Sequence, residues 1–401
     1  MSDPEPLIIV GSSVRAAAQS AARAGFSPWC IDQFGDRDLV EISDDFHIVT
    51  DWPNEIVSAI QSAPQAEWLY TGALENHRAL VEKLSRQRRL CGCGHEALSK
   101  LGDPTWLADT LANASLPNLP VIVPVSTIPE SGEWIVKPLA SAAGIGVRNL
   151  TGDNLGTTDF GGHYLQRKVR GRVISGLYLG VENSARLIGM CAQLCRGDDA
   201  RELCYVYSGS FGPLSADGIP ASTFQQAQKV GSAIAEAISS DCLSLRGLFG
   251  IDFVLDDETG DLWTLEINPR YTASTEIYER AFSWPLMRWH VDACRRRSSE
   301  AAALLDSRSF DGGWPIYGKL IVYAERDFTA PDIVPLVDRL PSSGFSNSNV
   351  EVSDIPQIGT LIQKHEPLCT LLTAQENFAT CQEILTAASR ELLTSIGEFA
   401  E

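Results

Sequence analysis

The N-terminal part of the chain alternates short apolar runs with a segment of helical period. The run "PLIIV" ends at a glycine turn, an alanine-rich segment extends to Gly25, and a second apolar run ends at Asp32. Short apolar runs bounded by glycine are typical of buried strands, and the segment between them predicts a helix. "EWLYTG" predicts another strand, followed by a helix near residues 77–88. Strands that alternate with helices predict an α/β domain with a parallel sheet.

The middle of the chain changes its pattern. A helix is expected over residues 98–113, and the proline-spaced "LPNLPVIVPVSTIPESG" then predicts a linker with an edge strand. "EWIVKPLASAAGIGVRNL" predicts strand, small-residue loop and strand, and "HYLQRKVRGRVISGLYLG" predicts two strands with Gly171 at their turn. After a helix near residues 225–239, "GIDFVLDDETGDLWTLEINPR" predicts two apolar strands joined by an acidic glycine turn.

Composition narrows the class of protein. With 401 residues, 44% of them hydrophobic, the chain can bury two or three domain cores. A formal net charge of −19 argues against nucleic acid as a partner, because phosphate backbones are bound by clustered Lys and Arg. The apolar runs are too short to cross a bilayer, and the N-terminus lacks the order of a signal peptide. A cytoplasmic protein with no membrane partner is therefore expected.

The stretch "LEINPR" carries the first candidate chemistry. Side chains alternate along a strand, so Glu266 and Asn268 share one face while their apolar neighbours pack on the other. Asp252, at the start of the partner strand, is expected at the same edge. Carboxylate and amide oxygens are ligands for Mg2+ (or Mn2+) beside substrate phosphates. A polar strand end capped by a turn is the alternative.

Lys137 follows an apolar strand and precedes a loop made almost entirely of Ser, Ala and Gly. The backbone amides of such a loop can approach an anion closely, and an ammonium beside them suits a nucleoside triphosphate. A flexible hairpin beside a surface lysine is the alternative. Arg270, just beyond the strand of Glu266, can clamp a phosphate or carboxylate with two hydrogen bonds.

In combination, "IVKP" with its small-residue loop, "YLQRKVRG", "GIDFVL" and "LEINPR" resemble the ATP-grasp superfamily, over nearly all of the chain. The nearest branch is that of the predicted ATP-dependent carboligases, related to tyramine–glutamate ligase and biotin carboxylase. The resemblance implies an α/β fold with a Rossmann-like pre-ATP-grasp domain at 1–105 and an ATP-grasp domain at 106–290, whose lid spans about 120–170. Residues 291–401 would complete the core.

The resemblance also implies roles for individual residues. Lys137 and Arg270 would be catalytic, the lysine on the α- and β-phosphates and the arginine on the transferred phosphate. The remaining ATP-binding residues would be Ser141, Gly144 and Gly146 in the closing loop and Gln166, Arg167 and Val169 at the adenine; the metal ligands would be Asp252, Glu266 and Asn268.

Two positions depart from the family pattern. Where many relatives have an Asp-Lys pair, this chain has Pro104 in the place of the lysine, and Lys100 stands a few residues earlier. Where relatives often have a glutamate for the ribose hydroxyls, "GRVISG" offers only Ser175. The resemblance therefore assigns no nucleotide contact to these two segments.

The resemblance implies an ATP-dependent ligase that joins a carboxylate to an amine through an acyl phosphate, releasing ADP and phosphate. Its substrates would be small molecules, in methanofuran- or pterin-type one-carbon cofactor biosynthesis, and it is compatible with a homodimer. A bicarbonate-dependent carboxylase-like enzyme and a protein that binds ATP without turnover are the alternatives.

Two segments are candidates for the substrate site. Glu75 and Asn76 follow the carboxyl end of an N-terminal strand, where ligands collect in open α/β sheets. Tyr271, Ser274 and Thr275 follow Arg270, so their hydroxyls are expected to line the acceptor side of the cleft. Core packing is the alternative for the tyrosine, and a helix N-cap is the alternative for Ser274 or Thr275.

Overall fold

The computed structural model describes residues 3–125, 129, 131–151, 160–197, 203–297, 299–340 and 350–399. Its N-terminal part is a parallel sheet of order β3-β2-β1-β4. The strands are β1 (Glu5–Val10), β2 (Phe26–Asp32), β3 (Asp45–Ile48) and β4 (Glu67–Tyr70). The helices between and after them are α1 (Arg15–Arg23), α2 (Arg37–Val40), α3 (Ile56–Ser62), the 3-10 turn η1 (Leu74–Asn76) and α4 (Arg78–Ser85). The predicted βαβ start and parallel sheet are confirmed.

The turn between β1 and α1 lies against the loop after β4. A Cβ on Gly11 would lie 1.8 Å from the Thr71 hydroxyl, so only glycine allows this approach. Ser12 donates its backbone N–H to the Gly72 carbonyl, which fixes the two loops side by side at the carboxyl edge of the sheet. This edge faces the rest of the molecule and forms one wall of the cavity described below.

A small antiparallel sheet of order β5-β8-β6-β7 follows. It contains β5 (Val121–Ile122), β6 (Trp134–Pro138), β7 (Arg148–Asn149) and β8 (His163–Arg167). The proline-spaced segment supplies the edge strand β5, as its prolines predict. The small-residue loop connects β6 to β7, which also agrees with the prediction.

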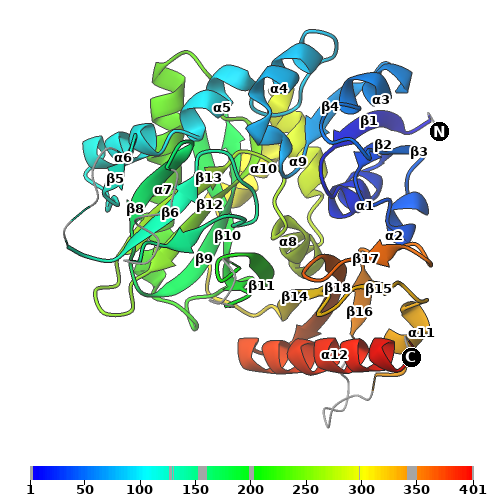
Figure 1. Ribbon diagram of the computed structural model, residues 1–401. Coiled ribbons are helices and arrows are strands. Elements are labelled where there is room, and N and C mark those ends of the chain that lie inside the picture. Colours follow the sequence, from blue (N-terminus) through cyan, green and yellow to red (C-terminus); the bar gives the residue numbers. More distant parts are fainter. Residues whose placement is uncertain are drawn as a thin grey trace.

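The largest sheet has eight antiparallel strands in the order β13-β12-β9-β10-β11-β14-β18-β16 (Figure 1). Its strands are β9 (Arg172–Val181), β10 (Ser184–Cys195), β11 (Tyr207–Gly212), β12 (Gly247–Leu255), β13 (Leu262–Asn268), β14 (Ile316–Tyr323), β16 (Glu351–Ser353) and β18 (Pro367–Gln375). Strands from the C-terminal region thus extend the sheet that carries Asp252 and Glu266. A separate short pair is formed by β15 (Phe328–Thr329) and β17 (Leu361–Ile362).

Helices cover this sheet, and the C-terminal helix lies across β14 and β18 in Figure 1. The remaining helices of the described chain are α5 (His95–Leu101), α6 (Pro104–Asn113), α7 (Ala221–Ser240), α8 (Thr275–Phe282), α9 (Leu286–Cys294), α10 (Ser299–Asp306), α11 (Val334–Val337) and α12 (Phe378–Phe399). One core joins the N-terminal sheet to α7 and β12, a second joins α1 to α8 and α9, and a third lies under α12. The N-terminal domain is therefore packed onto the large sheet through two shared cores.

Three predictions are corrected. The helix expected over residues 98–113 is two helices, because Asp103 caps the N-terminus of α6 and Pro104 begins it. The two strands around Gly171 do not form one hairpin; β8 belongs to the small sheet and β9 to the large one. Asp252 lies in the middle of β12 and not at its start.

In the part of the chain that the structure describes, no helix combines the length and apolarity needed to cross a membrane.

Candidate active site

A cavity of about 860 Å3 lies between the N-terminal domain, the small sheet and the large sheet. We call it the interdomain cavity. Eleven of the predicted site residues line it: Lys137, Gly144, Gln166, Arg167, Val169, Asp252, Glu266, Asn268, Arg270, Tyr271 and Ser274. The other predicted site residues, which support the wall from behind or lie beside it, are Ser141, Gly146, Glu75, Asn76 and Thr275. Segments far apart in the sequence are therefore brought to one place.

The predicted metal ligands meet on neighbouring strands. Asp252 of β12 stands directly opposite Glu266 of β13, and Gly250 stands opposite Asn268. Asn268 donates its amide to one oxygen of Asp252 at 2.8 Å, and Gln193 of β10 donates to the other at 2.8 Å. Two carboxylates and an amide thus face the same part of the interdomain cavity.

The two carboxylates differ in their electrostatic environment. Burial, with the nearby charge of Glu266 as the next cause, raises the pKa of Asp252 to about 7. Lys137 has the opposite effect on Glu266 and lowers its pKa, because the ammonium stabilises the charged carboxylate. Two facing carboxylates with one of them hard to ionise are the arrangement that a bound divalent cation relieves.

Lys137 is buried and points from β6 to the metal-ligand pair. Its ammonium lies 2.7 Å from Glu266 Oε2 and 3.5 Å from Gln166 Oε1. Burial disfavours the ammonium, but Glu266 outweighs burial and keeps the pKa of Lys137 above its usual value. The lysine is therefore charged and held in the cavity wall beside two carboxylates.

Arg270 is oriented by the N-terminal domain. Its Nε donates to Glu75 Oε1 at 2.6 Å, and one terminal nitrogen donates to Asn268 Oδ1 at 3.2 Å. The second oxygen of Glu75 is buried and has no hydrogen-bond partner among the described residues. Glu75, predicted at the substrate, thus contacts the arginine that follows the metal strand.

The small-residue loop is attached on two sides. Asn76 donates its amide to the Ser141 carbonyl at 3.0 Å, and Tyr207 donates its backbone N–H to the Ala143 carbonyl at 3.0 Å. Gly144 has φ +76°, and a Cβ there would lie 2.0 Å from the Tyr205 carbonyl oxygen. The loop therefore lies over the cavity between the N-terminal domain and the start of β11.

The predicted adenine segment closes another side of the cavity. Gln166 is buried near the end of β8 and donates its amide to the Leu265 carbonyl at 3.1 Å. The guanidinium of Arg167 lies over the ring of Trp134, 5.8 Å from its centre. Val169 lines the cavity directly after them. The segment joins the small sheet to the large one.

The hydroxyl residues after Arg270 take different directions. The hydroxyl of buried Tyr271 donates to the Ala16 carbonyl, so this side chain packs toward α1. Ser274 stands at the N-cap position of α8 without a side-chain cap bond, and its hydroxyl lies 3.1 Å from that of Thr272. Thr275 is fully buried and accepts from the Thr272 backbone. The hydroxyls of Ser274 and Thr275 both lie beside that of Thr272, and of these two residues Ser274 lines the cavity.

The structure shows where Lys100 and Ser175 lie, two residues whose roles the sequence left open. Lys100 forms a surface ion pair with Asp241 at 2.7 Å and does not line the interdomain cavity, so it does not take the place of the lysine missing at Pro104. Ser175 stands opposite Asp252 on β9 and lines the cavity. Its buried hydroxyl has no partner among the described residues.

The cavity is also lined by residues that were not predicted, among them Gln193, Arg15, Lys319 and Asp354. Gln193 interrupts an apolar strand, and that irregularity was a usable signal. The other three come from α1, β14 and the turn after β16, and no local pattern relates them. They lie at the end of the cavity near the N-terminal domain.

The fold and the cavity define an α/β protein whose ligand site is enclosed by two sheets and an N-terminal domain. Residues 105–274 match the family model described as the ATP-grasp domain. This part of the chain is therefore an ATP-grasp domain, which confirms the resemblance found in the sequence. No curated protein matches the chain in sequence.

Solved structures with this fold cover almost the whole chain. Rhizobium etli pyruvate carboxylase has a TM-score of 0.70 and 13% identity over 96% of this chain, which spans 37% of that longer protein. The L-amino acid ligase of Bacillus licheniformis has a TM-score of 0.69 and 12% identity over 98% of both chains. The biotin carboxylase domain of Hydrogenobacter thermophilus 2-oxoglutarate carboxylase was solved with MgADP, ADP and bicarbonate. It has a TM-score of 0.65 and 15% identity, and the match covers 97% of this chain and 90% of that one.

Proposed function

We propose that the protein is an ATP-dependent ligase that joins a carboxylate to an amine through an acyl phosphate, with release of ADP and phosphate. One observation carries the proposal: a buried ammonium, two facing carboxylates, an amide and a guanidinium line one enclosed cavity beneath a small-residue loop. Phosphoryl transfer needs positioning and charge neutralisation and little covalent chemistry from the protein. The match to the ATP-grasp domain and the fold shared with an L-amino acid ligase and a biotin carboxylase domain support this assignment.

The nucleotide would lie between the two sheets. Gln166, Arg167 and Val169 would hold the adenine, and the loop that contains Ser141, Gly144 and Gly146 would cover the phosphates with its amides. Lys137 would pair with phosphate oxygens once a metal ion shares Glu266. Its enclosed position strengthens this attraction, because the cavity wall has a lower dielectric constant than water.

The metal-ligand set fits Mg2+. Asp252 and Glu266 supply carboxylate oxygens and Asn268 an amide oxygen, and Mg2+ commonly uses one or two carboxylates together with substrate phosphates. Bound Mg2+ would neutralise charge on the phosphates. The unpartnered hydroxyl of Ser175 lies beside this set and is available to a ligand or its water.

The carboxylate substrate would be activated near Arg270. The guanidinium retains donors that can hold the transferred phosphate or the acyl phosphate, while Glu75 keeps it pointed at Asn268. Ser274, with Tyr271 and Thr275 behind it, would border the acceptor side, and Asn76 would fix the covering loop. The finer assignment, to one-carbon cofactor biosynthesis, rests on the resemblance alone.

The test is ADP release over a panel of carboxylates and amines, with hydroxylamine as a trap, since an acyl phosphate gives a hydroxamate. Carboxylate-dependent hydroxamate with matching ADP is expected. Bicarbonate as the sole activating substrate would point to the carboxylase alternative, and nucleotide binding without ADP release would point to a binding protein.

Two lysines provide a matched pair of variants. Lys137→Ala should abolish ADP release, because it removes the cation beside the phosphates. Lys100→Ala should retain it, because Lys100 pairs with Asp241 on the surface. Equal activity of the two variants would contradict the proposed nucleotide site.

A further inference from the structure

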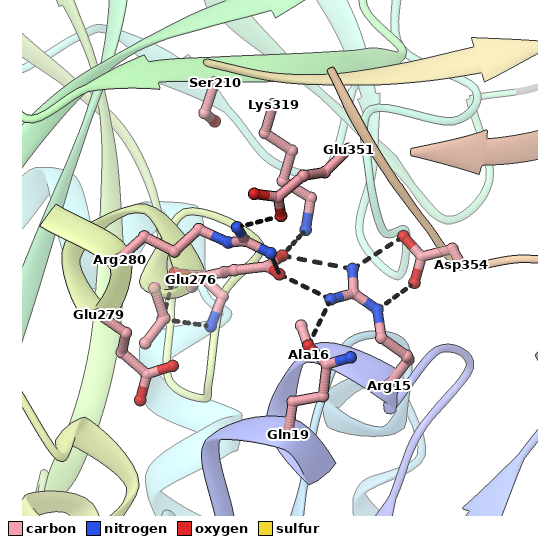
Figure 2. A network of polar contacts seen from close by, with 12 residues as sticks. Arg15, Ala16, Gln19, Ser210, Glu276, Glu279, Arg280, Lys319, Glu351 and Asp354 are labelled. Carbon is pink, nitrogen blue, oxygen red and sulfur yellow. Dashed lines mark hydrogen bonds and ion pairs between the residues drawn. The ribbon is translucent and has the colours of Figure 1, made fainter. Parts of the chain in front are cut away.

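The end of the interdomain cavity near the N-terminal domain contains a network of buried charges (Figure 2). Its centre is Glu276, the second residue of α8, which is 1% exposed. Three cations reach this carboxylate: Arg15 at 2.6 Å, Lys319 at 2.9 Å and Arg280 at 3.5 Å. Burial opposes its charge, but Arg15 and Lys319 hold the pKa of Glu276 well below its usual range. The network is therefore ionised.

The guanidinium of Arg15 is fully occupied by the protein. Its Nε and one terminal nitrogen donate to the two oxygens of Asp354 at 2.8 and 3.1 Å, and both terminal nitrogens donate to Glu276. Gln19 accepts the remaining proton at 3.2 Å. Arg15 therefore holds Asp354 and Glu276 in place and has no donor left for a ligand.

Lys319 differs from Arg15 in this respect. It is 4% exposed, lines the cavity and has three protons, and Glu276 is its hydrogen-bond partner among the described residues. Ser210, its neighbour across β11 and β14, lines the same wall with a fully buried hydroxyl. Two protons of a buried ammonium are therefore available to an anionic group in the cavity.

In Figure 2, Asp354 lies on the opposite side of the Arg15 guanidinium from Glu276, and it also lines the cavity. Its side chain is 23% exposed, and its backbone has φ +54°, in the left-handed region. Asp38 accepts the Asp354 backbone N–H at 3.0 Å and so helps to hold this conformation. Arg15 and Thr370 are the side-chain hydrogen-bond partners of Asp354, and a carboxylate offers about four lone-pair sites, so Asp354 can accept a further donor.

We propose that this end of the cavity binds the head group of an α-amino acid, with the carboxylate on Lys319 and the ammonium on Asp354. Both residues are tied to one guanidinium, Lys319 through Glu276 and Asp354 directly, so a cation and an anion line the same end of the cavity. The hydroxyls of Ser274 and Ser210, which pair with those of Thr272 and Tyr207, add neutral polar groups to the same wall. The inference rests on the proposed function and names its substrate class.

An amino acid could enter the reaction as the acceptor amine or, through a side-chain carboxylate, as the donor. The head-group contacts are the same for both. With ATP and hydroxylamine, a donor amino acid gives its own side-chain hydroxamate. An acceptor gives none and supports ADP release only when a second carboxylate is present. Either result agrees with the proposal and identifies the role.

The experiment measures binding by calorimetry to the full chain saturated with Mg2+ and a non-hydrolysable ATP analogue. Each L-amino acid is compared with two analogues: the amine that lacks its α-carboxylate and the acid that lacks its α-amino group. We expect at least one amino acid to bind about 10-fold or more tightly than both of its partners. Lys319→Gln should reduce the preference over the amine by about 10- to 150-fold, the effect of losing a hydrogen bond to a charged group. Asp354→Asn should reduce the preference over the desamino acid.

Arg280→Gln is the matched control, because Arg280 contacts the same Glu276 without lining the cavity. It should retain both preferences. If Asp354→Asn fails to fold, the Lys319 variant still tests the carboxylate contact. Equal binding of all three probes, no amino acid binding, or the same loss in Arg280→Gln as in Lys319→Gln would overturn the inference. Because binding needs no turnover, absence of hydroxamate and ADP would refute the proposed function separately.

Discussion

Substituting Lys137 or Glu266, which form an ion pair, should destabilise the protein by unequal amounts. The lysine side chain is 9% exposed and the glutamate side chain is 45% exposed, so only the glutamate is well solvated by the cavity. Glu266→Gln leaves a buried ammonium whose remaining partners are the neutral side chains of Gln166, at 3.5 Å, and Tyr164. Lys137→Met removes the buried charge and leaves a carboxylate that water can reach.

The difference between these variants can be estimated. Breaking a fully buried ion pair costs about 3–5 kcal/mol, and screening on the open side of Glu266 reduces this to about 1–3 kcal/mol for Glu266→Gln. Lys137→Met should cost less than about 1 kcal/mol. In the double variant neither charge remains, so its stability should be close to that of Lys137→Met. The resulting coupling free energy equals the cost of Glu266→Gln in size, about 1–3 kcal/mol.

Thermal unfolding without nucleotide measures this effect. For a chain of 401 residues, 1 kcal/mol corresponds to about 1 °C in Tm, so replicate scans of all four proteins are needed. Both single variants should also lose ADP release, which separates function from stability. If Lys137→Met were as destabilising as Glu266→Gln and the two effects added in the double variant, the argument from unequal burial would be wrong.

Three further outcomes are expected. Asn268→Ala should abolish ADP release with an unchanged circular dichroism spectrum; near wild-type turnover at ordinary Mg2+ would contradict the metal assignment. Gly144→Ala should lower kcat/KM for ATP by about 10-fold or more, because its Cβ would overlap the Tyr205 carbonyl and move the loop. Burial lowers the pKa of His290 to about 4, so the unfolded chain binds a proton that the fold excludes, and about 3 kcal/mol of stability should be lost as pH falls from 6.5 to 4. Urea titrations of wild type and His290→Gln measure that slope, which should be shallower in the variant.

Local patterns were sufficient for much of the fold. The β1, α1 and β2 unit and the β12–β13 hairpin were predicted because their strands are neighbours in sequence and strongly apolar. The break before α6 was missed although Asp103 and Pro104 form a standard helix start. The separation of β8 from β9 could not be predicted, because sheet membership depends on strands that are distant in the chain.

The candidate site shows the same division. Asp252 and Glu266 were placed together because one hairpin carries both. The bond from Arg15 to Asp354 joins residues 339 positions apart, and the pairing of Arg270 with Glu75 spans 195. Such pairs depend on the packing of whole domains, which hydrophobic period does not specify. Sequence reasoning therefore brought together the strands of the predicted metal ligands and missed the charged end of the cavity.

The ion pairs of the ligand-free site determine how metal and nucleotide can bind to it together. Lys137 is paired with Glu266 and Arg270 with Glu75, but Asp252 is held by neutral amides and has no part in the ion pairs of the described residues. Asp252 is therefore the carboxylate that gains most from an added cation. Lys137 can form an ion pair with a phosphate only when another cation takes its place beside Glu266. Otherwise the Glu266 carboxylate would lose its ion-pair partner, which is costly in a buried site. Metal and nucleotide should consequently bind this site with positive coupling, which depends on Lys137 being charged and enclosed.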